Sequence, residues 1–353
     1  MKDKSCCGAD SAGRTAGKSR PRRLLTNKFF LTSLVLLGLV GLSYKLPALL
    51  AFRTSLLSYL RSIWWAVLLG FFLGGIIERF VPREYVSLIL ARKRKRTIFS
   101  AVVLGFLMSS CSHGILALSI QLYKKGASIP VVVAFLLASP WANMPITILL
   151  LSFFGLKALY ILLGAMLTAF FTGIVFQFLE RRGWVETNPH TLEIERGYSI
   201  REDFLRRAAG YRLTWNQLGK DCREIVKGAL GLADMVLWWI LLGAGLASLA
   251  AAFIPHEWFQ RYMGPTALGL LVTLALATVM EVCSEGTAPF AFEIFKQTGA
   301  FGNAFVFLMA GVVTDFTEIG LIGFNVGWRT AVWIPLVAVP QVILLGIAAN
   351  GLF

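Results

Sequence analysis

The sequence has few charged residues and few cysteines. Only 15% of its 353 residues are charged, whereas a soluble protein carries roughly a quarter, which argues against a cytosolic enzyme. The five cysteines form an odd set without the spacing of a disulfide scaffold. The patterns GxxxxGK(S/T), HExxH and GxSxG are also absent, which leaves ATP hydrolysis unsupported and weakens membrane protease and lipase functions.

Apolar sequence is abundant instead, at 57% of residues with a mean hydropathy of +0.70. A membrane-spanning helix needs about 20 mainly apolar residues. The runs that qualify are 29–50, 63–81, 98–122, 129–153, 156–179, 229–254, 265–295, 301–326 and 329–350. The first lacks a small-residue cleavage site, which favours a retained anchor over a signal peptide. The sequence therefore predicts an all-α, polytopic protein embedded in a lipid bilayer.

The net charge of +15 is concentrated beside these apolar runs. Residues 1–28 hold eight Lys or Arg against two Asp, and 92–96 are five consecutive basic residues. Basic clusters that flank membrane spans mark cytoplasmic loops, whereas a nucleic-acid binder carries its basic residues on a soluble face. We expect a multi-pass protein of the cell inner membrane with a cytoplasmic N-terminus and no nucleic-acid partner.

Four pairs of short motifs recur in the same order at an offset of 172 to 174 residues. They are Trp64-Trp65 with Trp238-Trp239, Phe80 to Glu84 with Phe253 to Glu257, Cys111 to Gly114 with Cys283 to Gly286, and Phe135 to Ser139 with Phe307 to Gly311. This agreement indicates a duplication. We divide the chain into a basic leader, an extra transmembrane helix, a first membrane repeat, a polar cytoplasmic linker and a second membrane repeat, at 1–28, 29–54, 55–180, 181–227 and 228–353.

Counting Lys and Arg then constrains the topology. If every apolar run crossed the membrane, the cation-rich linker 181–227 would lie opposite the leader, against the positive-inside rule. The conflict disappears if one segment of each repeat is a re-entrant hairpin, and the best candidates carry Cys111 to Gly114 and Cys283 to Gly286. Each repeat then crosses three times, so the repeats have inverted topology, as in transporters whose broken helices meet near the bilayer midplane.

The paired Cys-Ser-x-Gly motifs are the first candidates for a binding site. Thiolate and imidazole suit thiophilic metals and metalloids, so Cys111, His113 and Cys283 form a candidate metal-ligand set. Ser112, Ser284 and Glu285 complete the predicted substrate contacts in these turns. The predicted helix breaks lie at Gly114, Pro140, Pro145, Gly286 and Pro289. A buried cysteine can equally pack as a small hydrophobe.

Polar residues inside later apolar runs are the second candidates. Prolines on both sides of Asn143 predict an unwound helix near the membrane centre. Asp315 occupies the equivalent position and precedes Glu318. Intramembrane acids are typically functional, so Asn143 and Asp315 are predicted to bind substrate, while Glu285, Asp315 and Glu318 bind or relay a coupling ion or proton. Asn143 and Asp315 could instead make structural hydrogen bonds between helices, and Glu293 is expected to reach an interface.

Over about residues 60 to 350, the chain resembles the predicted-permease family that includes the ArsP-type organoarsenical efflux permeases. The residues that carry the resemblance are Cys111 to Gly114, Lys125 to Ser128, Ala134 to Pro140 with Asn143, and Val282 to Gly286 with Pro289. The resemblance implies an inner-membrane permease, with efflux of trivalent organoarsenicals as the best-known family activity, and places Cys111, Cys283, Pro140 and Asn143 in the transport core. Family members commonly have cysteine where His113 stands, and Pro and Asn where Val312 and Asp315 stand. These departures bear on the substrate more than on the fold.

We therefore expect a transporter rather than an enzyme. It would export a small soft metalloid, organoarsenical or metal species by secondary active transport, without a cofactor. Two alternatives stay open, a membrane redox protein that uses Cys111 and Cys283 as thiols, and a membrane subunit that works with a separate ATPase or regulator. A homo-oligomer is compatible with the sequence.

Overall fold

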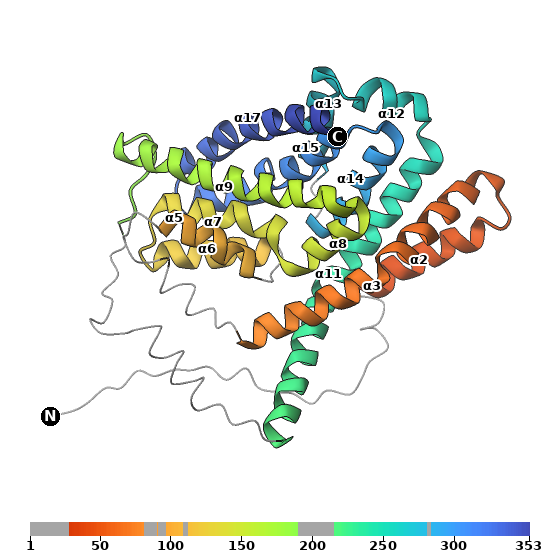
Figure 1. The fold of residues 1–353 in the computed structure, drawn as a ribbon, viewed down its shortest axis with the longest axis horizontal. Helices are drawn as coiled ribbons and strands as arrows, with labels where there is room; N and C mark the ends of the chain where they lie inside the picture. The colour runs from red at the N-terminus through yellow and green to blue at the C-terminus, as the bar shows by residue number, and fades with distance from the viewer. Residues whose placement is uncertain (1–27, 81–89, 91–96, 109–111, 190–214, 281–283) are drawn as a thin grey trace.

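The computed structural model describes residues 28–80, 90, 97–108, 112–189, 215–280 and 284–353, and every regular element among them is helical (Figure 1). Five helical stretches in this part of the chain are long and apolar enough to cross a membrane. A sixth is added if the bent pair α12 (His256–Met263) and α13 (Ala267–Val279) counts as one span. The expectation of an all-α polytopic protein is confirmed at this level.

The chain begins differently from the expected single helix over 29–54. Helix α2 (Lys28–Leu42) has 15 residues and is followed by a turn, the short helix η1 (Pro47–Leu49) and the 31-residue helix α3 (Leu50–Phe80). Leu46 has extended backbone angles, as expected for the residue before a proline, and this separates the two helices. The expected boundary at 54 and 55 thus falls inside α3. At 1.5 Å per residue α2 is about 22 Å long, shorter than a bilayer core.

Two series of five helices follow, and their starting residues are evenly offset. The first series is α5 (Thr97–Leu107), α6 (Ser112–Lys124), α7 (Ile129–Ala142), α8 (Met144–Phe154) and α9 (Ala158–Arg181). The second is α13, α14 (Ser284–Thr298), α15 (Phe301–Val313), α16 (Phe316–Asn325) and α17 (Trp328–Leu352). Helices α14, α15 and α16 each begin 172 residues after α6, α7 and α8. The short helix η2 (Gly155–Lys157) joins α8 to α9.

The interior of the described residues contains two large apolar cores. Each core includes helices from both series. The first core holds α5, α6 and α7 with the second half of α9, the first half of α17 and part of α16. The second core holds α13, α14 and α15 with α8, the first half of α9 and the second half of α17. Thus α9 and α17 run through both cores in opposite directions. Because α8 joins the core of the second series and α16 that of the first, the two series interlock.

The pairs α5–α6 and α13–α14, named here hairpin 1 and hairpin 2, enter the molecule from opposite ends. The end of α6 meets the segment after α9, where Asn188 Nδ2 donates to the Tyr123 carbonyl at 2.7 Å. At the other end of the bundle, Gln260 of α12 donates to the carbonyl of Gln297, near the end of α14. Between these ends, Ser139 Oγ donates to the Gly105 carbonyl at 2.9 Å. The tip of hairpin 1 therefore lies beside the break between α7 and α8.

The outward face of α9 is apolar along its whole length. Its exposed large apolar side chains recur about once per turn and are Leu159, Leu163, Leu167, Phe171, Ile174, Val175 and Phe178. A continuous apolar stripe facing outward is typical of a helix that contacts lipid. This face of α9 is therefore suited to contact with lipid.

Helix α11 (Trp215–Phe253) has 39 residues and packs against α3 (Figure 1). It begins before the expected end of the linker at 227, so the last part of that linker is helical. Arg79 of α3 pairs with Asp221 of α11 at 2.8 Å, and the Asp221 carboxylate is almost fully buried. Gly75 provides the close approach, because an added Cβ there would meet the backbone of Ile225 and Ala229.

Candidate functional site

The predicted break at Asn143 separates α7 from α8. Asn143 has extended backbone angles, and its Oδ1 accepts a hydrogen bond from the Ile146 N–H at 2.9 Å, so its side chain caps α8. Pro140 lies inside α7, and Pro145 in the first turn of α8. The interruption therefore falls between the two prolines rather than at either of them.

The break between α15 and α16 has the same construction. Asp315 is extended, and its Oδ1 accepts from the Glu318 N–H at 3.0 Å, which caps α16. The hydroxyl groups of Thr278, at the end of α13, and Thr314 lie 2.8 Å apart. The tip of hairpin 2 thus adjoins this break, as the tip of hairpin 1 adjoins the other.

The structure brings Asn143 and Glu285 together from the two series. The Asn143 Nδ2 donates to Glu285 Oε1 at 3.4 Å, and the two residues are 1% and 2% exposed. Glu285 and Gly286 lie in the first turn of α14. Pro289 lies further inside the same helix. Helix α11 approaches this turn so closely that a Cβ on Gly243 would collide with the Gly286 carbonyl. A buried carboxylate and a carboxamide therefore meet where helix ends converge.

Two buried polar atoms near the breaks are unsatisfied. Glu318 is 4% exposed, and its Oε1 has no hydrogen-bond partner among the described residues. The indole N–H of Trp141, two residues before Asn143, likewise has none within that part of the chain. Buried polar atoms are normally paired. An acceptor of this kind can bind a proton or a cation. A donor of this kind can bind a polar group of a ligand.

The two cysteines of the predicted soft-ligand site, Cys111 and Cys283, lie outside the described residues. The backbones of Ser112, His113 and Gly114 begin α6, and that of Ser284 begins α14. Hence Gly114 and Gly286 follow the helix interruptions and lie within helices. Among the described residues, no group of three His, Cys, Asp or Glu is arranged to hold a metal ion.

Glu293 differs most from its expectation. Its side chain is 0% exposed and does not reach an interface. It accepts hydrogen bonds from the hydroxyl of Tyr59 and from Gln297 Nε2. Tyr59 lies 234 positions earlier in the chain, so no local pattern could have indicated this burial.

A family model described as a predicted permease, ArsP_1, matches residues 48–351. The chain belongs to this family. The permease is a multi-pass membrane protein, and its family is one of transporters rather than enzymes. The match includes both helical series, both breaks and α3.

Three curated proteins are similar to the permease. "UPF0718 protein YcgR" of Bacillus subtilis (strain 168) is 22% identical over 258 residues, 72% of this chain and 81% of that protein. "Putative permease Rv2963" of Mycobacterium tuberculosis is 24% identical over 255 residues, 66% of this chain but only 60% of its own length. A protein of Streptococcus mutans named "Putative two-component membrane permease complex subunit" is 20% identical over 256 residues, 72% of this chain and 79% of that protein. No solved structure matches the permease.

Proposed function

We propose that the permease is a secondary-active exporter of a small thiophilic solute, such as a trivalent organoarsenical, another metalloid or a soft metal ion. The substrate site would lie between the hairpin tips, with Cys111, His113 and Cys283 as soft ligands and Asn143, Glu285 and Asp315 as polar contacts. The contact between Asn143 and Glu285 is the observation that carries this proposal. It joins the two series beside interrupted helices, where transporters place their binding sites.

The helix boundaries support the duplication and its inverted topology. The nearly constant offset between the two series, 170 to 172 residues, and the equivalent caps at Asn143 and Asp315 are what a duplicated unit would produce. Hairpins entering from opposite ends agree with inverted repeats, each with three crossings and one re-entrant segment. In the sequence, the basic residues 92–96 directly precede α5, whose Ile98 packs in the same core as Leu179, close to the end of α9 at Arg181. We infer that this end is cytoplasmic.

The soft substrate class is inferred from the chemistry of the two turns. In the sequence, each motif has a cysteine directly before the first residue of a helix, and thiolates favour soft metals and metalloids. The unsatisfied Glu318 oxygen supports a role for this acid in binding the coupling ion.

Efflux from cells tests the proposal. Cells without their own metalloid exporters would express wild type, Cys111→Ser, Cys283→Ser or Glu285→Gln and be challenged with trivalent methylarsenical, arsenite or antimonite. Wild type should lower accumulation at least tenfold for one of these, and each variant should abolish the effect. Cys222→Ser is the matched control, because Cys222 is an exposed thiol on α11. Equal accumulation in wild type and empty-vector cells for all three compounds would refute the proposed substrate class.

A second candidate function is that of a membrane subunit in a larger permease complex. The name of the Streptococcus mutans relative, a complex subunit, favours it. Purification in mild detergent from the native membrane distinguishes the candidates. A stoichiometric partner required for transport supports the complex, whereas transport by the purified chain alone in liposomes contradicts it.

A further inference from the structure

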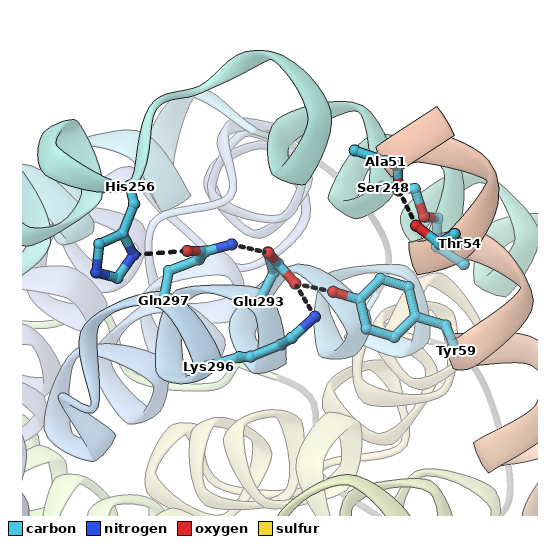
Figure 2. A network of polar contacts seen from close by, with 9 residues as sticks. Ala51, Thr54, Tyr59, Ser248, His256, Glu293, Lys296 and Gln297 are labelled. Atoms are coloured by element: carbon cyan, nitrogen blue, oxygen red, sulfur yellow. Dashed lines mark hydrogen bonds and ion pairs between the residues drawn. The ribbon is translucent and has the colours of Figure 1, made fainter. Parts of the chain in front are cut away.

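A chain of polar contacts leads from a buried acid to the surface at the α12 end of the molecule (Figure 2). Glu293 of α14 accepts from Tyr59 of α3 and, at 2.6 Å, from Gln297 Nε2. Gln297 Oε1 lies 2.8 Å from Nδ1 of His256, at the start of α12. Because a carboxamide oxygen only accepts, His256 Nδ1 carries the proton in this contact. Three helices are thus held together around one carboxylate.

The charge of this carboxylate is weakly compensated. Lys296 Nζ is 3.9 Å from Glu293 Oε2, but that lysine side chain is 51% exposed, whereas the Glu293 side chain is 0% exposed. The other groups that face Glu293 are the neutral Tyr59 and Gln297, with His256 beyond Gln297. Helices α8 and α15, which pack on α14, contain no charged residue. Residues 235–253 of α11, which include the close approach of Gly243 to Gly286, contain none either, and Glu257 and Arg261 of α12 are exposed. Burying a carboxylate with such limited compensation favours its neutral form.

Helix α14 connects this acid to the proposed substrate site. Glu285 and Glu293 lie eight residues apart on the same helix, which is about 12 Å at 1.5 Å per residue. Glu285 contacts Asn143, while Glu293 holds α14 against α3 and, through Gln297, against α12. A change at Glu293 can therefore move hairpin 2 at its substrate-binding end.

We propose that Glu293 is a proton-binding site of the permease, loaded from the aqueous face at α12, and that its protonation drives the movement of hairpin 2. On loading, hydronium in the water at His256 gives up its proton, an O–H bond forms at a Glu293 oxygen, and no electron is transferred. If Oε1 is protonated, its O–H faces Gln297 Nε2, which can only donate, so that contact is lost; if Oε2 is protonated, its contact with the Tyr59 hydroxyl weakens or reverses direction. Either change loosens the contacts that hold α14 against α12 and α3. Release of the proton restores the contacts.

The role of Glu293 in coupling rests on the proposed export function, but proton binding can be measured without a substrate. Infrared difference spectra between acidic and alkaline pH would be recorded for the purified full chain. Wild type should show a protonated-carboxyl band that Glu293→Gln lacks and Glu257→Gln, an exposed control on α12, retains. An unchanged band in Glu293→Gln overturns the proposal.

Tyr59→Phe provides a second test if Glu293→Gln does not fold. Removing the hydroxyl takes away a donor to the ionised carboxylate, so the midpoint of the carboxyl band should move to higher pH. A midpoint identical to wild type overturns the proposal.

Transport in liposomes then separates coupling from export. With trivalent methylarsenical as the probe, Glu293→Gln should keep exchange between equal concentrations but lose at least tenfold of the accumulation driven by a pH gradient. If Glu293→Gln retains gradient-driven accumulation, the coupling role is overturned. If wild type transports no arsenical while the infrared band depends on Glu293, the proposed substrate fails and the proton site stands.

Discussion

The side-chain amide of Asn143 donates to the Glu285 carboxylate across 3.4 Å, between two helix ends that are 142 residues apart in the chain. Hydrogen bonds between membrane helices are worth only about 0.6 to 2 kcal/mol. A contact of this strength can hold the two series together in one state of a transport cycle and release them in another. A neutral amide also leaves the carboxylate able to bind a proton or a cation.

Asn143→Asp should therefore reduce transport more than Asn143→Gln. The aspartate places a second acid beside buried Glu285, and two like charges at this distance raise the energy of the ionised pair. We expect at least a tenfold loss of arsenical efflux at neutral pH. The double variant Asn143→Asp with Glu285→Gln restores one acid and one amide, and partial recovery would show that charge is responsible. If the double variant is no better than the single one, the geometry of the contact matters more than its charge.

Gly243→Ala should destabilise the packing of α11 against hairpin 2. A Cβ at this position would collide with the backbone carbonyl of Gly286, which cannot move aside as a side chain could. Overpacking typically costs about 1 to 3 kcal/mol, and a backbone collision should reach the upper end of that range. Gly231→Ala is the matched control on α11, because its Cβ would meet nothing within 4 Å. Thermal unfolding in detergent should show a lower Tm for Gly243→Ala and an equal or higher Tm for the control.

Glu186 should make stability depend on pH at the end of the bundle where α17 begins. Its carboxylate accepts from the backbone amides of Arg329 and Thr330 and from the Thr330 hydroxyl. Burial raises the pKa of Glu186, but these hydrogen bonds outweigh it, so the pKa lies below its ordinary value. The stabilisation is thus fully present above the unfolded pKa of about 4.3 and is lost as the pH falls through the lower folded pKa.

Glu186→Ala removes this cap of α17. By comparison with other helix caps, it should lower stability by about 1 kcal/mol at pH 7, and the difference from wild type should shrink in acid. Glu224→Ala removes an exposed acid on α11 and should leave the stability at wild-type level both at pH 7 and in acid. A Tm difference between wild type and Glu186→Ala that is the same at pH 3 and pH 7 would contradict the role assigned to this carboxylate.

Much of the architecture could be predicted from apolar runs, because each run folds as one or two helices whose positions depend mainly on its own sequence. Asn143 and Asp315 could be found for a similar reason, since a polar residue at a helix interruption has a local signature. The burial of Glu293 could not be predicted, because an acid near the end of an apolar helix has the same sequence pattern whether it reaches water or is buried. Its burial depends on Tyr59, 234 positions away. The separation of α2 from α3 could have been predicted from the local sequence, because Pro47 favours an extended backbone at Leu46.

Asp315 allows the structural role of a helix cap to be separated from a role in transport. Its side chain caps α16 through the Glu318 N–H, so Asp315→Ala should lower stability by about 1 kcal/mol. Asp315→Asn keeps an acceptor oxygen, as Asn143 does at the equivalent break, and should unfold at nearly the wild-type Tm. If the negative charge binds the coupling ion beside Glu318, Asp315→Asn should nevertheless lose at least tenfold of arsenical efflux. Wild-type efflux by well-folded Asp315→Asn would show that Asp315 is a cap alone and would leave Glu318 as the acid of this break.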